Sequence, residues 1–319
     1  MPHSREEFDK MFDFNLMYEE LLKRGSKLAM IPVSRLQHIR EDIEDLKKRY
    51  TLNDFQQYII NRIYQLDLPE TDFEIRSILL VATPSPAMTN IRFHWERKSC
   101  IFPIPATYTD FISIPKQLEQ YLNEELNLKG YHALFSYGLP RKLLAVRSGL
   151  GVYGRNDLCY VDGMGSFLNI SPFYTDIPCT DDVWHDIRQM DLCKDCKACV
   201  KNCPTGAIKE DRTPIDTDRC LTFHNEADGE REFPEFIGPA SHNSVVGCMR
   251  CQNVCPKNKE YLRNTAGPVD FDNEETALLL EGTAFEHFPE SLRQKIETLG
   301  IMDYLSALPR NLKALLDIS

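Results

Sequence analysis

Cysteines in two short segments form the most specific chemical pattern of this chain. In the first segment Cys193, Cys196, Cys199 and Cys203 follow the spacing C-x2-C-x2-C-x3-C, and Pro204 comes next. This is the bacterial ferredoxin signature, in which three thiolates bind one iron–sulfur cluster and the fourth reaches a different one. The spacing therefore predicts two [4Fe-4S] clusters.

The second segment contains Cys248, Cys251 and Cys255, followed by Pro256, and lacks one cysteine of the full motif. Cys220 is the only nearby residue that completes it. We therefore predict two ligand sets that exchange members between the segments. The first set is Cys193, Cys196, Cys199 and Cys255, and the second is Cys203, Cys220, Cys248 and Cys251.

Zinc ligation and disulfide formation are two other possible uses of these cysteines. Pairs with CxxC spacing also form zinc sites, but tetrahedral zinc rarely uses the complete ferredoxin spacing with its proline. Disulfides are disfavoured because no secretory segment precedes the charged N-terminal pattern, which indicates a cytoplasmic protein. Cys100, Cys159 and Cys179 have no partner spacing, so we interpret them as buried or incidental thiols.

The composition is that of a globular protein. The 319 residues are 42% hydrophobic and 10% aromatic, enough for a sizeable core, and no apolar run of membrane-spanning length occurs. Lys and Arg number 37 against 48 Asp and Glu, a net charge of −11. The average field repels polyanions, so nucleic acid is not expected as a partner.

Helical and strand patterns alternate before the cysteines. Residues 77–83 read as a strand buried on both faces, and 91–95 as a half-exposed strand continued by extended chain over 101–105. Further strands are expected over 131–136, 158–161 and 166–173, and helices over 8–23, 36–50, 54–66, 114–126, 143–148, 181–188, 275–280 and 289–299.

These elements indicate an α+β fold with a mixed α/β catalytic core. We expect an α/β domain over 1–180 with N-terminal helices, a ferredoxin-like double-cluster module over 181–264, and an acidic helical tail over 265–319. From Ala266 onward the tail has ten Asp or Glu against four Lys or Arg. The region before the module is too long for a simple ferredoxin and should hold the site where electrons are used.

Several segments resemble the epoxyqueuosine reductase family, cobalamin-dependent iron–sulfur enzymes related in their core to reductive dehalogenases. The matching segments are Leu144–Asn156, Gly165–Phe167, Cys193–Ile208, Arg219–Thr222 and Gly247–Pro256. The resemblance implies a nitroreductase and reductive-dehalogenase type of core. It also implies a base-off cobalamin held between that core and the ferredoxin-like module, with one cluster near the cobalt.

The glycine-rich segment is the candidate cofactor cradle. Gly149, Gly151 and Gly154 would let backbone amides approach a large ligand closely, and Arg155 and Asn156 would supply polar contacts. The same glycines formally match a dinucleotide fingerprint, but they follow a helical pattern instead of a strand. Without the resemblance, Arg155 is a surface cation and Asn156 a turn residue.

Two hydroxyl side chains complete the predicted cofactor site. Thr222 falls where the family has a hydroxyl near the corrinoid, and Ser166 is similarly placed; both could instead cap backbone groups. His224 and His242 flank Cys220 and Cys248 in sequence. Either histidine could donate a proton or bind cobalt, but ordinary hydrogen-bonded histidines are the simpler interpretation.

The sequence departs from the family pattern in three places. The stretch 134–138 has no carboxylate where the family has an aspartate thought to donate the proton, and Tyr137 is the nearest replacement. The tail is short and acidic where many family members carry tRNA-binding repeats. The stretch 101–108 is apolar and proline-stiffened, which favours a small or apolar substrate.

From these features we expect a cobalamin-dependent reductase of an unidentified small molecule, supplied with electrons by a small redox donor such as ferredoxin or flavodoxin. An alternative is an activating protein that reduces the corrinoid of a partner. Reduction of epoxyqueuosine in tRNA ranks below both.

Overall fold

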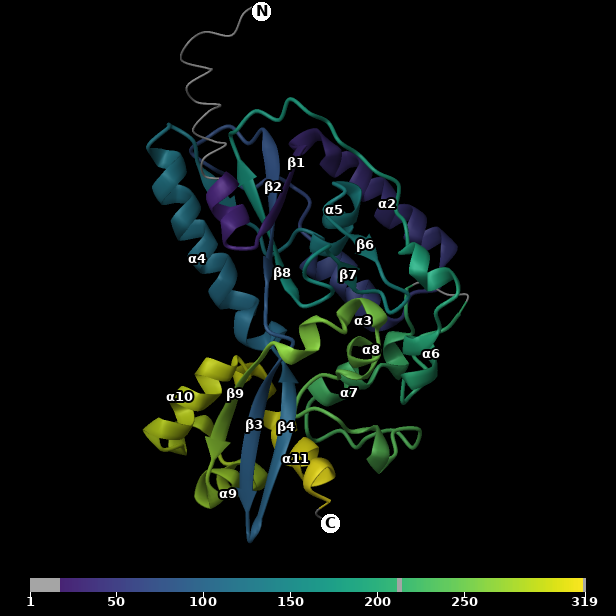
Figure 1. The fold of residues 1–319 in the computed structure, drawn as a ribbon, viewed down its shortest axis with the longest axis vertical. Helices are drawn as coiled ribbons and strands as arrows, with labels where there is room; N and C mark the ends of the chain where they lie inside the picture. The colour runs from purple at the N-terminus through teal and green to yellow at the C-terminus, as the bar shows by residue number, and fades with distance from the viewer. Residues whose placement is uncertain (1–17, 211–213, 318–319) are drawn as a thin grey trace, which may run out of the picture.

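The computed structural model describes residues 18–210 and 214–317, and its upper half in Figure 1 is built on a four-stranded sheet. The strands lie in the order β1 (Lys27–Pro32), β2 (Ser77–Pro84), β8 (Leu168–Thr175) and β5 (Ala133–Phe135). Every neighbouring pair is antiparallel. The expected strands over 77–83 and 131–136 are confirmed, and the strand expected over 166–173 is shifted by two residues.

Strand β2 is covered on both faces, as its continuous apolar run predicts. Ile78, Leu80 and Ala82 belong to a core shared with helices α2 (Leu36–Arg49) and α5 (Arg141–Arg147). Leu79 and Val81 face the opposite way, toward helix α4 (Thr107–Asn127). Since side chains alternate along a strand, both faces must be apolar, and helices flank the sheet on either side in Figure 1.

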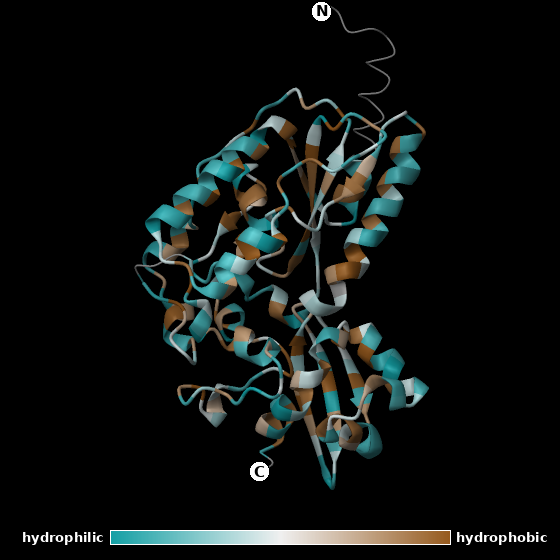
Figure 2. Ribbon diagram, turned by 180° about the vertical axis from the view of Figure 1, so that it is seen from behind, coloured by the Kyte–Doolittle hydropathy of each residue, from teal (hydrophilic) through white to brown (hydrophobic). Residues whose placement is uncertain are grey.

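A second sheet of three strands forms the lower half. Strand β3 (Met88–Trp95) pairs antiparallel with β4 (Lys98–Pro105) and parallel with β9 (Thr265–Phe271). Its apolar face packs against helices α9, α10 and α11. Figure 2 shows apolar residues on the inward faces of these elements. The three helices are α9 (Asn273–Glu281), α10 (Glu290–Leu299) and α11 (Leu308–Leu316).

The C-terminal segment contributes a strand to the second sheet as well as helices. Helices over 275–280 and 289–299 are confirmed, but the segment opens with strand β9, which the sequence did not predict. Through β9 it shares one sheet and one core with β3 and β4, which come from the first 180 residues. Packing between elements crosses the domain boundaries proposed at 180 and 264. These boundaries therefore stay predictions.

The cysteine-bearing module consists of short helices and turns beside these sheets. Helix α6 (Ala198–Asn202) carries Cys199 of the first cysteine segment and packs against α8 (Arg250–Asn253), which carries Cys251 of the second. Helix α7 (Leu221–Glu226) begins directly after Cys220. The two segments, about fifty residues apart in sequence, are thus neighbours in space.

The remaining elements are short. The strands β6 (Val152–Tyr153) and β7 (Cys159–Tyr160) form a two-stranded ribbon. The helical turns are η1 (Val33–Arg35), α3 (Asp54–Tyr58), η2 (Ile59–Ile63), η3 (Asp191–Lys194), η4 (Thr217–Arg219), η5 (Pro239–Ser241), η6 (Pro256–Asn258), η7 (Tyr261–Arg263), η8 (Phe285–His287) and η9 (Met302–Ala307).

The helix expected over 181–188 is wrong, because this segment runs without regular structure. Asp182 forms a bidentate ion pair with Arg35, at 2.6 and 2.7 Å, and Trp184 packs against the core beside α2. The backbone N–H of His185 donates to the carbonyl of Arg147. Partners on other elements replace the hydrogen bonds that a helix would make.

The helix expected over 8–23 begins outside the described residues, and its described part, 18–23, is helical. The helix expected over 54–66 ends at 63 and is divided between α3 and the π-helical turn η2. Within the described ranges, the helices are all too short or too polar to span a lipid bilayer.

We expect Phe93→Ala to lower the free energy of unfolding by about 3 to 5 kcal/mol, because it leaves a cavity in a packed core. Phe93 is 2% exposed and stacks on Phe271 with ring centroids 5.2 Å apart. The matched control is Ile101→Ala on β4, where the side chain is 53% exposed. Denaturant unfolding should separate the two variants, and equal losses would contradict the proposed packing of the second sheet.

Candidate cluster and cofactor site

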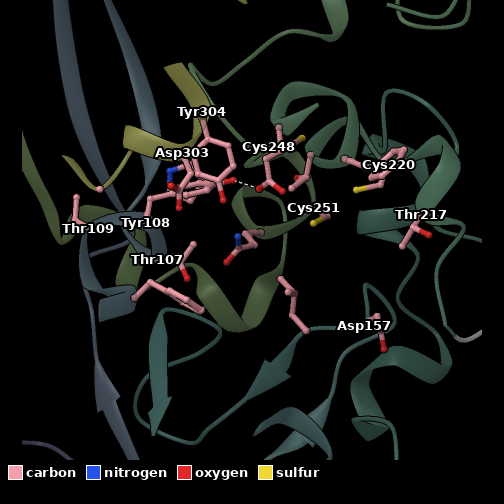
Figure 3. Close-up of a pocket in the computed structure, with 18 of the residues that line it drawn as sticks. Thr107, Tyr108, Thr109, Asp157, Thr217, Cys220, Cys248, Cys251, Asp303 and Tyr304 are labelled. Carbon is pink, nitrogen blue, oxygen red and sulfur yellow. Dashed lines mark hydrogen bonds between the residues drawn. The ribbon is translucent and has the colours of Figure 1, made fainter. Parts of the chain in front are cut away.

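A cavity of about 780 Å³ lies where the upper sheet, the cysteine-bearing module and the C-terminal segment meet. We call it the junction cavity. Its walls come from the start of α4, the loop around Asn156, helices α7 and α8, and turn η9. Figure 3 shows Cys220, Cys248 and Cys251 on one side and Tyr108, Asp303 and Tyr304 on another.

A second cavity of about 330 Å³, the side cavity, adjoins the first. The two share lining residues at Pro105, Thr107, Phe111, Lys142, Leu158 and Gln252. The side cavity extends toward the ends of β2 and β8, where Ser85 and Ser166 line it. The two cavities therefore form one bent space between the core and the module.

The four cysteines of the first predicted set come together beside the glycine-rich loop. Cys193, Cys196, Cys199 and Cys255 all line one small cavity with Gly154 and Tyr160. Burial raises the pKa of the Cys199 thiol to about 11, and the other three thiols of this set oppose its ionisation further. Because thiolates are the ligands of iron, these closely spaced thiols need cationic iron to be ionised together.

The second predicted set is also gathered in space. Burial raises the pKa of the Cys220 thiol, and the nearby Cys248 raises it further. Burial and the nearby Cys203 likewise raise the pKa of Cys248. The pKa of Cys251 is raised mainly by burial, and then by Cys248 and Cys220. Cys251 is also influenced by Cys199 of the first set, so the division of ligands between two clusters, including the assignment of Cys220, stays a prediction. Three of these cysteines line the junction cavity.

Polar groups point at sulfur atoms of the second set. The backbone N–H of Ala207 lies 3.3 Å from Cys203 Sγ, and Asn243 Nδ2 lies 3.4 Å from Cys248 Sγ. Hydrogen bonds to ligand sulfur are one way in which a protein tunes the reduction potential of an iron–sulfur cluster. The loop geometry thus suits a redox site better than a purely structural one.

The glycine-rich loop packs mainly against protein. A side chain at Gly149 would collide with His185, one at Gly151 with Cys159, and one at Gly154 with Tyr160. These glycines therefore permit close packing of the loop, and in the described structure none of them lines the junction or side cavity. A direct contact between them and a cofactor stays a prediction.

Arg155 joins the core to the cluster module. Its two terminal nitrogens donate to the backbone carbonyls of Cys193 and Glu210. Its Nε atom is buried without a hydrogen-bond partner among the described residues. The guanidinium thus holds the first cysteine loop in place, a role that the sequence-based interpretation of a cofactor contact did not include.

Asn156, Thr222 and Ser166 lie at the cavities. Asn156 is buried, donates from Nδ2 to the hydroxyl of Tyr160 at 3.1 Å, and lines the junction cavity, as Thr222 does. Ser166 lines the side cavity, where its hydroxyl bonds to Gln252 Oε1 at 3.0 Å. The positions of all three suit the predicted cofactor contacts.

Tyr137 does not line either cavity in the described structure. It is 54% exposed, packs edge-on against Phe135, and lines a neighbouring depression with Gln65 and Tyr174. Its proton-donating role stays a prediction without support from this position.

The two histidines also lie outside the lining of these cavities. His224 Nε2 bonds to the carbonyl of Asp218 at 2.7 Å, and His242 packs against Phe233. Burial lowers the pKa of His242. These contacts favour the simpler interpretation of both residues as structural histidines.

Sequence reasoning missed the titratable side chains of the junction cavity other than its cysteines, among them Tyr108, Glu226, Lys142 and Asp157. The hydroxyl of Tyr108 donates to Glu226, the dashed line in Figure 3. Lys142 Nζ donates to the carbonyl of Asp157 at 2.8 Å and lies 3.5 Å from its carboxylate. Asp157 follows Asn156 in the recognised motif, but no local signal marks the other three.

Burial is the largest single effect on Lys142 and lowers its pKa, but Asp157, Tyr64 and Cys159 together outweigh it, so the pKa is raised. The ammonium group therefore stays protonated and presents a fixed positive charge to both cavities.

Comparison with known families identifies the cysteine module. A model described as a 4Fe-4S double cluster binding domain matches residues 192–258. The prediction of two [4Fe-4S] clusters is confirmed by this match, and zinc ligation is not supported.

Relatives of known activity match the chain over its middle part. An epoxyqueuosine reductase of Synechococcus sp. (strain CC9605) is 32% identical over 193 residues, 59% of this chain and 55% of the relative. The enzyme of Atelocyanobacterium thalassa is 28% identical, covering 55% of this chain and 56% of the relative. The chain thus matches only about half the length of these relatives.

Solved structures share the fold. A selenomethionine-labelled epoxyqueuosine reductase matches with a TM-score of 0.60 at 18% identity, covering 97% of this chain and 82% of that one. An epoxyqueuosine reductase with an epoxyqueuosine-modified stem loop of tyrosine tRNA matches with the same TM-score, identity and coverage. The mixed helix-and-strand fold and the resemblance to this family are confirmed.

These findings overturn two expectations from the sequence. Ranking epoxyqueuosine reduction below reduction of a small molecule, and below electron delivery to a partner, was wrong, since the homologues are epoxyqueuosine reductases. Dismissing nucleic acid was wrong too, since a structural neighbour is bound to a tRNA stem loop. A net charge averages the whole surface and does not describe the local field at one site.

We expect Cys220→Ser and Cys255→Ser each to lose about half of the bound iron, because each residue is assigned to a different cluster. Iron and sulfide analysis after anaerobic reconstitution measures the loss. Cys100→Ser is the control, since this cysteine lies on β4 outside both sets. Full iron content in Cys220→Ser would refute the second ligand set.

Proposed function

We propose that this chain is an iron–sulfur, cobalamin-dependent reductase that acts on epoxyqueuosine in tRNA. The observation that carries the proposal is the junction cavity, whose wall is formed by cysteines of the matched double-cluster module. A substrate in this cavity lies next to the electron carriers. The proposed substrate is taken from the homologues, which are epoxyqueuosine reductases.

The residues present fit a corrinoid. The joined cavities offer an extended space with many apolar lining residues, which suits a large, flat macrocycle. Beside the side cavity, the Ser85 hydroxyl and Arg141 Nη2 are buried without hydrogen-bond partners among the described residues. Such groups require partners, and the peripheral amides of a corrinoid would supply them.

Four polar side chains would hold the cofactor: Asn156 and Thr222 from the junction cavity, and Ser85 and Ser166 from the side cavity. When bound, the clusters supply one-electron carriers and the corrinoid supplies a reducible cobalt.

Reduction of an epoxide to an alkene consumes two electrons and two protons, breaks both C–O bonds, and releases the oxygen as water. The protein must therefore stabilise negative charge as it develops on oxygen. The ammonium group of Lys142, fixed by Asp157, provides a positive charge at the cavity.

The cavity mouth suits an unstacked nucleoside. Phe111 and Ile112 line it and are 47% and 60% exposed, although they are large and apolar. Arg141 stacks on the Phe111 ring at 4.8 Å from its centroid. Proteins that read single-stranded RNA stack bases on such aromatic and guanidinium surfaces. A tRNA substrate also places the proposed reaction in the cytoplasm.

We expect the protein, reconstituted anaerobically with iron, sulfide and cobalamin, to convert epoxyqueuosine to queuosine in a modified tRNA stem loop. Dithionite serves as the electron source and mass spectrometry of the digested nucleosides as the readout. Protein reconstituted without cobalamin is the control. A fully loaded protein that binds the stem loop but leaves the epoxide intact would refute the proposed reaction.

We expect Phe111→Ala to weaken stem-loop binding by roughly 5-fold to 150-fold, the effect of about 1 to 3 kcal/mol for one stacked base. Fluorescence anisotropy with a labelled stem loop measures the change. Leu128→Ala, at the far end of α4 and 80% exposed, is the matched control. Unchanged affinity in Phe111→Ala would exclude stacking at this residue.

A further inference from the structure

Glu226 differs from the other carboxyl groups of the junction cavity. Glu297 and Asp303 are exposed to solvent, and Asp157 is paired with Lys142. Glu226 is partly buried, and its hydrogen-bond partner is the neutral phenol of Tyr108. Within the described ranges no cation forms an ion pair with it.

The position of Glu226 is fixed by its neighbour in sequence. Asn225 is fully buried at the last turn of α7, and its Nδ2 donates to the carbonyl of Gly247 at 2.8 Å. Asn311 Nδ2 donates in turn to the carbonyl of Asn225 at 2.8 Å. Helix α7 is thus tied to the second cysteine segment and to α11, which holds the Glu226 carboxyl at the cavity wall.

Tyr108 is equally constrained. Its ring packs edge-on against Tyr304, with centroids 5.3 Å apart, and its hydroxyl approaches Gly247 so closely that a side chain there would collide with it. Gly247 has a positive φ of 72°, which glycine adopts without strain. The hydroxyl can therefore turn toward little except Glu226 and the cavity.

This environment makes the Glu226 carboxyl harder to ionise than that of an exposed glutamate. Burial raises the pKa of its carboxyl, and the hydrogen bond from Tyr108 offsets that effect in part. A raised pKa means that the proton is retained to higher pH than in an exposed glutamate. Other titratable or charged groups around the pair are Tyr304 and Asp303 on η9, the Cys220 thiol before α7, and Arg310 of α11, which donates to the carbonyls of His224 and Ala227.

We propose that the Glu226 carboxyl, held by the Tyr108 hydroxyl, is the proton source for the reduction in the junction cavity. This inference rests on the proposed function and adds a catalytic group to it. Glu226 would give one proton to the departing epoxide oxygen and become a carboxylate. Tyr108 then stabilises the carboxylate by donating its hydrogen bond, and Glu226 is reprotonated from solvent.

Atoms and electrons balance in this step. An external one-electron reductant supplies two electrons, Glu226 supplies one of the two protons, and solvent supplies the other. The epoxide oxygen leaves as water. Glu226 is the catalytic residue, and Tyr108 is a positioning residue.

The direct test is infrared difference spectroscopy of the reconstituted full-length protein at about pH 6, where an unperturbed glutamate is ionised. We expect a protonated carboxyl band that shifts in D₂O and is absent in Glu226→Gln. Tyr108→Phe should keep the band but move it, because the carboxyl loses its hydrogen bond. A spectrum in which Glu226→Gln removes no such band would overturn the inference.

The kinetic test is single-turnover reduction of the modified stem loop. We expect Glu226→Gln to slow the reaction by about 100-fold or more while iron content, cobalamin content and stem-loop affinity stay unchanged. Tyr108→Phe should slow it less. Glu235→Gln, on an exposed loop, is the control. A Glu226→Gln rate within about two-fold of the unaltered protein would refute the role.

The two proposals fail in different ways. If the unaltered protein reduces no epoxyqueuosine, the proposed function fails, and the infrared band still decides whether Glu226 holds a proton. If the unaltered protein is active and Glu226→Gln is equally active, the proposed function stands and the assignment of Glu226 is wrong.

Discussion

Interleaving of the two cysteine segments is the constraint on which the rest of the structure depends. In the proposed ligand sets, Cys255 joins the first segment and Cys203 joins the second, so neither cluster can form from one segment alone. Packing of α6 against α8 satisfies this requirement, and Arg155 ties the first loop to the core. Because Cys220, Cys248 and Cys251 line the junction cavity, the same crossing brings three predicted cluster ligands to that cavity.

The sheets position this crossing from two sides. Helix α5 and the glycine-rich loop after it leave the upper sheet and bring Lys142 and Asn156 to the cavity. The second sheet, through β4, leads into α4 and places Tyr108 opposite them. Close packing at Gly151 and Gly154 lets the loop lie against its own ribbon without intervening side chains. The cavity is thus a product of several chain segments and belongs to no single domain.

How far the sequence predicts this site depends on whether the signal is local. The cysteine spacing and the apolar run of β2 are both visible within a few consecutive residues. The two clusters and the burial of this strand on both faces were therefore predictable. Tyr108 and Glu226 are 118 residues apart, and neither carries a motif; only the fold brings them together. The stretch 181–188 has helical spacing, but its partner Arg35 is distant in sequence, so the prediction failed there. The net charge gave a wrong expectation about nucleic acid because it does not say where on the surface the charges lie.

Strand β9 has a consequence for how the protein is made. It inserts beside β3 only after some 170 intervening residues have left the ribosome, and the segment that follows it contributes Asp303 and Tyr304 to the cavity. The cysteine segments leave the ribosome before strand β9, since the second of them ends at Pro256. The junction cavity, in contrast, lacks part of its wall until the C-terminal segment has docked. A ligand that needs the complete cavity can therefore bind only after the last part of the chain has folded.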